Sequence, residues 1–146
     1  MSLLHPTPGQ VLDRISILNL KIRAYREAGR PFAALDGEWG ELMVHLQLLW
    51  PKVADGETDK PWRTNLHKLN QALAAVNCEI WKDEDEVRLL EGTGWDKDLV
   101  TCHIHIAKLN DERMRLVREI DKAFGWNDPV EEKIYAGGEY GNIKSS

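Results

Sequence analysis

The sequence lacks most of the features that identify a class of enzyme. Its 146 residues include only two cysteines, Cys78 and Cys102, without the C-x-x-C spacing of redox or zinc motifs. There is no glycine-rich phosphate loop and no G-x-S-x-G nucleophile motif. We therefore expect reduced cysteines, no disulfide framework and no nucleophilic catalysis.

Long apolar runs and an excess of positive charge are also missing. No stretch approaches the roughly 20 apolar residues of a membrane span, and the first residues lack the regions of a signal peptide. The net charge is −5, whereas general binding to nucleic-acid phosphates needs a basic surface. We expect a cytoplasmic protein that binds neither membranes nor nucleic acid in general.

The two-residue period of β-strands is absent as well, and no internal repeat occurs. Helical periodicity and breakers instead predict four helices, with a polar loop over Lys52–Lys60. Their expected ranges are Gly9 to Ala28, Pro31 to Leu49, Pro61 to Glu91, and from a cap at Asp96 or Asp98 to Phe124-Gly125. The predicted fold is one all-α domain: an antiparallel bundle of about four helices (about 9–125) and an extended C-terminal tail (about 126–146).

What the sequence does contain is a polar stripe on the third predicted helix. Its members recur at steps of four and three residues beside the apolar stripe, and therefore share one helix face. They are Asn77, Trp81, Glu84, Arg88 and Glu91. An amide, an indole, two carboxylates and a guanidinium bordering a buried seam are typical of a ligand cleft between helices.

The fourth predicted helix repeats this pattern. Asn110 and Arg113 fall in register with Ile106, Val117 and Ile120 and should face the core. A buried arginine without partners costs several kcal/mol, so it must meet carboxylates, a bound anion or water. One interpretation is an Arg113 pair with Glu84 or Glu91 that fixes helix register. The other is that the same groups also hold a ligand.

The first predicted helix adds Asp13 and Lys21, eight residues apart and on one face with Ile17. Asp13 is a candidate ligand contact, but a surface pair with the adjacent Arg14 explains it equally well.

A metal site is the main alternative that the acidic run Asp83–Glu86 suggests. In all-α nucleotide pyrophosphohydrolases, glutamates three or four residues apart on two helices bind Mg²⁺. Here Arg88 separates Glu84 from Glu91 on the same face, which lowers the expected affinity for a cation. His103 and His105 lie on opposite flanks of a helix and cannot share a metal. We predict no metal and no cofactor, with Mg²⁺ needed only under this alternative.

Four ordered motifs resemble an uncharacterised family of small helical bacterial proteins, a domain of unknown function. The family's D-K/R-I-S/T-I-L, N-x-x-L-W-x-x-E-D-x-I-R, L-N-D-x-R and V-E-E-K-x-Y motifs are similar to segments within Gly9–Lys21, Val76–Glu91, Leu109–Arg113 and Val130–Tyr135. The segment from about Arg30 to Thr64 departs from the pattern. The resemblance implies that both polar stripes belong to one site, but it supplies no reaction.

Three functions are compatible with these observations. The first is a non-catalytic protein that binds a phosphorylated or nucleotide-like molecule, for example a signalling nucleotide or a nucleotide-sugar. Trp81 or Tyr135 would stack on the ligand's ring, and Lys133 would neutralise a phosphate. The others are a metal-dependent phosphohydrolase and a helical adaptor or oligomerisation module. The tail should reach the cleft or a partner subunit, which would make a homodimer natural.

Overall fold

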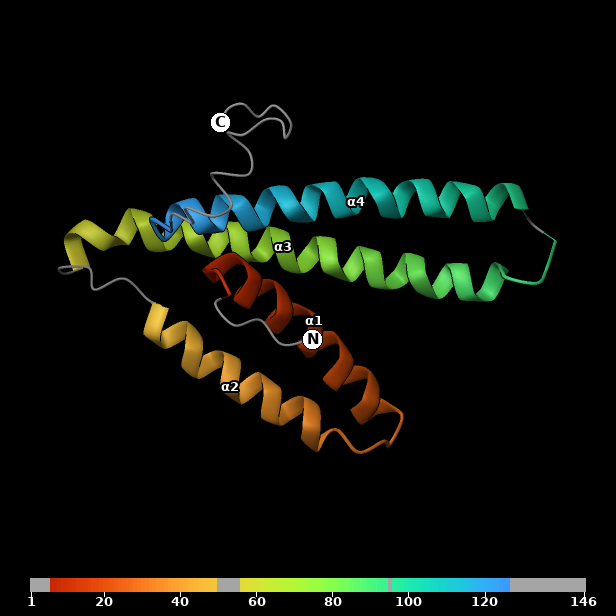
Figure 1. Cartoon of the computed structure of the whole chain (residues 1–146), viewed down its shortest axis with the longest axis horizontal. Helices are drawn as coiled ribbons and strands as arrows, with labels where there is room; N and C mark the ends of the chain where they lie inside the picture. Colours follow the sequence, from red (N-terminus) through yellow and green to blue (C-terminus); the bar gives the residue numbers. More distant parts are fainter. Residues whose placement is uncertain (1–5, 50–55, 95, 127–146) are drawn as a thin grey trace, which may run out of the picture.

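The computed structural model describes residues 6–49, 56–94 and 96–126, and four α-helices account for most of these residues (Figure 1). They are α1 (Pro8–Glu27), α2 (Ala33–Leu49), α3 (Gly56–Leu90) and α4 (Asp96–Ala123). Each helix runs against the one before it, and no strand occurs in the described ranges. The predicted all-α antiparallel bundle is confirmed. The predicted extended tail lies outside the described residues from 127 onward.

Helix ends follow the breakers in the sequence with one exception. Gly29, Gly92 and Gly125 adopt positive φ angles of 68°, 81° and 69° just after α1, α3 and α4, as expected for glycine at a helix C-terminus. The exception is the predicted start at Pro61: α3 begins at Gly56, so part of the predicted loop is helical. Pro61 is the sixth residue of α3, so the helix continues through it although proline cannot donate the intrahelical hydrogen bond at this position.

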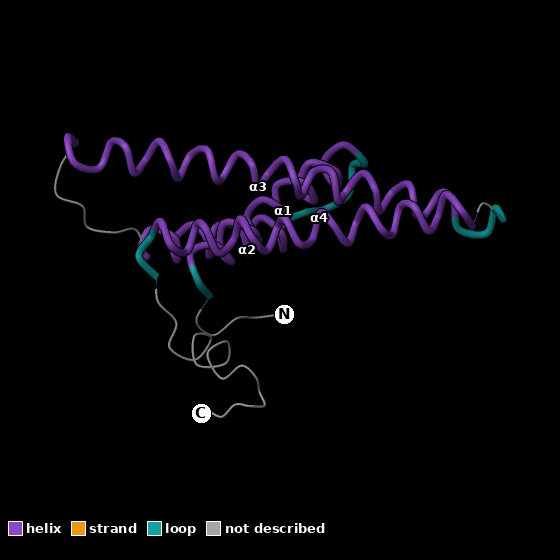
Figure 2. Tube along the Cα trace, turned by 90° about the horizontal axis from the view of Figure 1, so that it is seen from above, coloured by secondary structure: helices purple, strands orange, loops and turns teal. Residues whose placement is uncertain are grey.

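The helices form two pairs (Figures 1 and 2). α3 and α4 lie side by side as a long antiparallel pair. α1 packs on both of these helices, and α2 packs on α1. We call the end of the long pair at which α3 stops and α4 starts its distal end. Toward that end, α3 and α4 extend beyond α1 (Figure 1).

The main hydrophobic core lies where α1 crosses the long pair. All four helices contribute to it, with α2 supplying Leu46. The buried members are Val11, Leu12, Ile15, Leu46, Leu66, Leu73, Leu116, Val117 and Ile120. Packing at this crossing fixes the position of α1 on the long pair.

The N-terminus of α1 is anchored on α4. Thr7 and Gln10 form a capping box, in which the Thr7 hydroxyl accepts from the Gln10 N–H at 3.2 Å and the Gln10 side chain accepts from the Thr7 N–H at 2.9 Å. The backbone N–H of Gly9 donates to Oδ1 of Asp121 at 2.7 Å, which places a carboxylate at the positive end of α1. This contact sets where the next turn of α1, with Asp13, meets α3 and α4.

Candidate functional site

The Asp13 carboxylate joins three helices. Arg113 on α4 donates from Nε to Oδ1 and Oδ2, each at 3.0 Å, and from Nη2 to Oδ2 at 2.8 Å. Asn77 on α3 donates from Nδ2 to Oδ1 at 2.9 Å. A carboxylate has about four acceptor sites, and these four contacts use three N–H hydrogens, because Oδ1 and Oδ2 share the single Nε hydrogen of Arg113.

Two further residues complete this cluster. Asn77, only 4% exposed, also directs its Nδ2 to the Ser16 hydroxyl at 3.3 Å. Arg113 donates from Nη1 to the side-chain Oδ1 of Asn110 at 3.2 Å, and the Nδ2 of that amide donates to the backbone oxygen of Ile106 on the same helix at 3.2 Å. We call the cluster the inner network; it consists of Asp13, Ser16, Asn77, Asn110 and Arg113.

The inner network is electrostatically closed. The side chains of Asp13 and Arg113 are 13% and 29% exposed, so each charge has lost most of its water and depends on the other. The bidentate pair neutralises the guanidinium as well as the carboxylate. Asp13 and Arg113 therefore compensate each other's charge within the fold.

The predicted pairing of Arg113 with Glu84 or Glu91 is wrong. The Asp83–His105 ion pair sets the register of the two long helices, and Arg113 lies eight residues from His105, about 12 Å along α4. Glu84 is thus too far toward the distal end. The surface pair of Asp13 with Arg14 is wrong too, because Arg14 binds Glu38 of α2.

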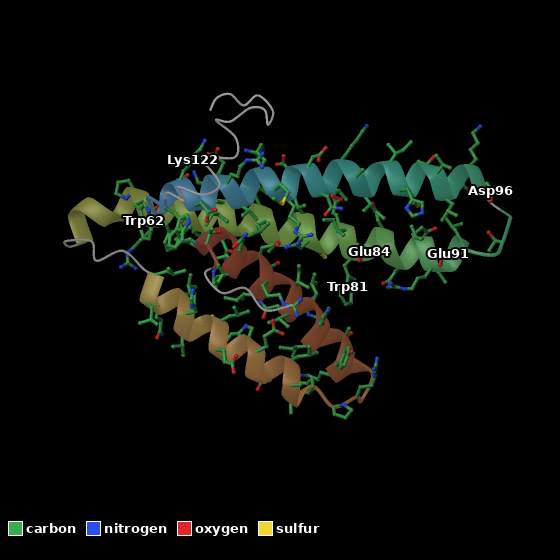
Figure 3. All side chains as sticks on the ribbon, in the orientation of Figure 1. Trp62, Trp81, Glu84, Glu91, Asp96 and Lys122 are labelled. Atoms are coloured by element: carbon green, nitrogen blue, oxygen red, sulfur yellow. The ribbon has the colours of Figure 1, made fainter. Side chains whose placement is uncertain are left out.

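The rest of the predicted stripe lies beyond the inner network. Trp81 is half-buried one turn after Asn77, while Glu84, Arg88 and Glu91 are exposed. Figure 3 shows Trp81, Glu84 and Glu91 in succession along α3 toward the distal end. The ion pair of Arg88 is with its helix neighbour Asp85, not with either predicted glutamate. We call these four residues, Trp81, Glu84, Arg88 and Glu91, the outer stripe.

Three predicted ligand-binding residues remain, of which the structure describes one. Lys21 is half-buried on α1, two turns after Asp13. Lys133 and Tyr135 lie outside the described residues.

Among the described residues, metal-ligating side chains do not assemble into a centre. Within the described ranges, no three His, Cys, Asp or Glu residues are placed to hold a metal ion. Burial, together with the carboxylates of Glu86, Asp83 and Asp98, raises the pKa of the Cys102 thiol. A raised pKa favours the thiol over the nucleophilic thiolate.

A second ion pair fixes α2 on α1. Arg14 donates from Nε and Nη2 to Glu38 at 2.7 and 3.0 Å, and these hydrogen bonds are the main reason that the pKa of Glu38 is lowered. A carboxyl group with a lowered folded-state pKa stabilises the fold above its unfolded pKa. That stabilisation is lost as the pH falls through the folded-state value.

Glu38→Gln should therefore reduce the acid sensitivity of folding. Both side chains are 37% exposed, so we expect the pair to contribute at most about 1 kcal/mol at neutral pH. Urea unfolding between pH 7 and pH 3 should show the variant losing less stability on acidification than the wild type. Glu41→Gln, at an exposed carboxylate of the same helix, is the matched control. Equal pH profiles for wild type and Glu38→Gln would contradict this role.

Comparison with family models, with curated proteins and with solved structures finds no match to this chain. Within the described ranges, no helix combines the length and the apolar character needed to cross a membrane.

Proposed function

We propose that the protein binds a small phosphorylated or nucleotide-like molecule along the outer stripe, in the cytoplasm and without catalysing a reaction. The main support for this proposal is that the polar face of α3 has two parts, one in the inner network and one in the outer stripe. The two charges of the inner network neutralise each other, whereas the outer stripe continues the same face with a half-buried indole and three exposed charged groups.

Each member of the outer stripe has a suitable role in such a complex. Trp81 offers a flat apolar surface for a base or sugar ring. Glu84 and Glu91 can accept hydrogen bonds from ribose hydroxyls or exocyclic amines. Arg88, whose side chain is 63% exposed, can exchange Asp85 for a phosphate because a surface ion pair contributes little. Lys21 is the cation that α1 adds to the predicted site residues.

The inner network takes a positioning role in this proposal. By tying α1 to α3 and α4 at Asp13, it fixes the point at which α1 leaves the long pair. The hydrogen bonds that join Asp13, Asn77 and Arg113 from three helices support a common purpose for these residues. Their contribution to affinity would then be indirect, through the placement of Trp81.

A thermal-shift screen followed by titration calorimetry tests the proposal. Nucleotides and nucleotide-sugars, each with and without Mg²⁺, should include compounds that raise the melting temperature of the full chain. Arg88→Ala should weaken binding of such a compound about tenfold or more, the value of one lost charged hydrogen bond. Lys82→Ala removes the same charge from another face of α3 and should leave affinity unchanged.

Three results would contradict the proposed ligand binding. Equal losses from Arg88→Ala and Lys82→Ala would indicate only general charge attraction. No stabilising compound in the screen would favour the adaptor function, in which the polar residues only fix register. Release of inorganic phosphate that depends on Mg²⁺ would favour the phosphohydrolase.

A further inference from the structure

The outward face of α4 carries an exposed apolar stripe. Six large hydrophobic residues of the described ranges are exposed, and three of them are on α4: Val100 at 55%, Ile104 at 54% and Met114 at 51%. Ala107 falls in the same register, so the four side chains share one face. α4 contacts α3 and α1 through its other faces, which hold Arg113, Leu116 and Ile120.

The spacing of this stripe is that of a coiled-coil seam. Val100, Ile104, Ala107, Asp111 and Met114 follow each other at steps of four, three, four and three residues. Isolated exposed hydrophobic residues are common on protein surfaces and need no partner. Three of them in coiled-coil register, on a face that none of the other described helices covers, indicate a helix–helix interface.

We propose that this face forms a homodimer in which α4 packs against α4 of a second copy in the antiparallel direction. The part of the stripe from Ile104 to Met114 is self-complementary in that direction, while Val100 lies opposite the partner's Arg118. With a twofold axis beside Leu109, Ile104 lies opposite the partner's Met114, and Asp111 lies opposite the partner's Ala107. The small alanine leaves room for the carboxylate, and the partner's Lys108, one residue further on, can pair with it.

Charge selects this arrangement over the parallel one. In a parallel, in-register pair, Asp111 would face the same residue of the second copy, and two carboxylates in one apolar seam repel each other. The antiparallel pair replaces this repulsion with two symmetric Asp111–Lys108 contacts. A single helix face is smaller than a standard interface of about 1,600 Å², so the dimer should be reversible and concentration-dependent.

Sedimentation velocity of the full chain over a range of concentrations tests the interface. The wild type should shift from monomer to dimer as concentration rises, and Ile104→Asp should remain monomeric. Leu89→Asp is the matched control: Leu89 is 73% exposed on α3 and should be irrelevant to the dimer. Circular dichroism should show unchanged helix content in both variants, because both side chains face solvent in the monomer.

Charge reversal tests the direction of the helices. Asp111→Lys and Lys108→Asp should each weaken the dimer at least tenfold, and the double variant should restore it. A monomeric wild type, a dimer that survives Ile104→Asp, or one that is lost in Leu89→Asp would overturn the proposed face. Failure of the double variant to restore association would overturn the antiparallel arrangement.

Discussion

Asp13→Ala is expected to destabilise the protein by about 3 kcal/mol, because it leaves the Arg113 guanidinium without its counter-charge where α1 meets α3 and α4. Removal of one partner of a buried ion pair usually costs about 3–5 kcal/mol, and the 29% exposure of Arg113 places this case at the lower end. Asn77 also loses the better of its two acceptors. Urea denaturation at pH 7 measures the change.

Two companion experiments separate charge from shape. Asp13→Asn keeps an oxygen acceptor of the same size but removes the charge, so its cost should be intermediate. Asp13→Leu combined with Arg113→Met replaces the pair with apolar groups, and the double variant should be more stable than the sum of its single variants implies. Additive single costs would show that the pair is not energetically coupled.

The same variants bear on function. If the double variant folds stably and keeps its affinity for a nucleotide-like compound, the inner network serves the fold alone. If it folds stably and loses affinity, the network positions the outer stripe or contacts the ligand directly. In either case Arg88→Ala acts at a different place on α3, so its effect on affinity remains an independent measurement.

Sequence periodicity predicted which faces of the helices are polar, but not what lies opposite them. The steps of four and three residues place Asn110 and Arg113 inward, and the structure confirms this register for both. The same steps carry no information on where α1 crosses the long pair. Arg113 was therefore matched with glutamates on its neighbour α3, although its partner Asp13 is on α1.

Ser16 was missed for a related reason. A serine within a helix usually faces solvent or binds its own backbone, so nothing in its type predicts a contact between helices. The sequence does place Ser16 three residues after Asp13, so both residues lie on the same face of α1. Its hydroxyl is buried beside Asn77 and accepts a second hydrogen bond from the amide that also donates to Asp13.

Gly9→Ala should destabilise the protein by about 1–3 kcal/mol, the usual cost of overfilling a packed contact. A Cβ at residue 9 would lie 2.3 Å from the backbone oxygen of Val117 and 2.9 Å from Oδ1 of Asp121. A side chain could rotate away, but the carbonyl of Val117 belongs to α4. α1 and α4 would therefore have to separate, which also lengthens the hydrogen bond from the Gly9 N–H to Asp121.

Gly40→Ala provides a control of opposite sign. Gly40 lies within α2, and no atom lies within 4 Å of the position that its Cβ would occupy. Alanine should stabilise a helix interior by about 0.5–1 kcal/mol relative to glycine, because the unfolded chain loses freedom and nothing clashes. Thermal unfolding should therefore move the two midpoints in opposite directions. A Gly9→Ala midpoint at or above the wild-type value would show that α1 does not depend on this close approach to α4.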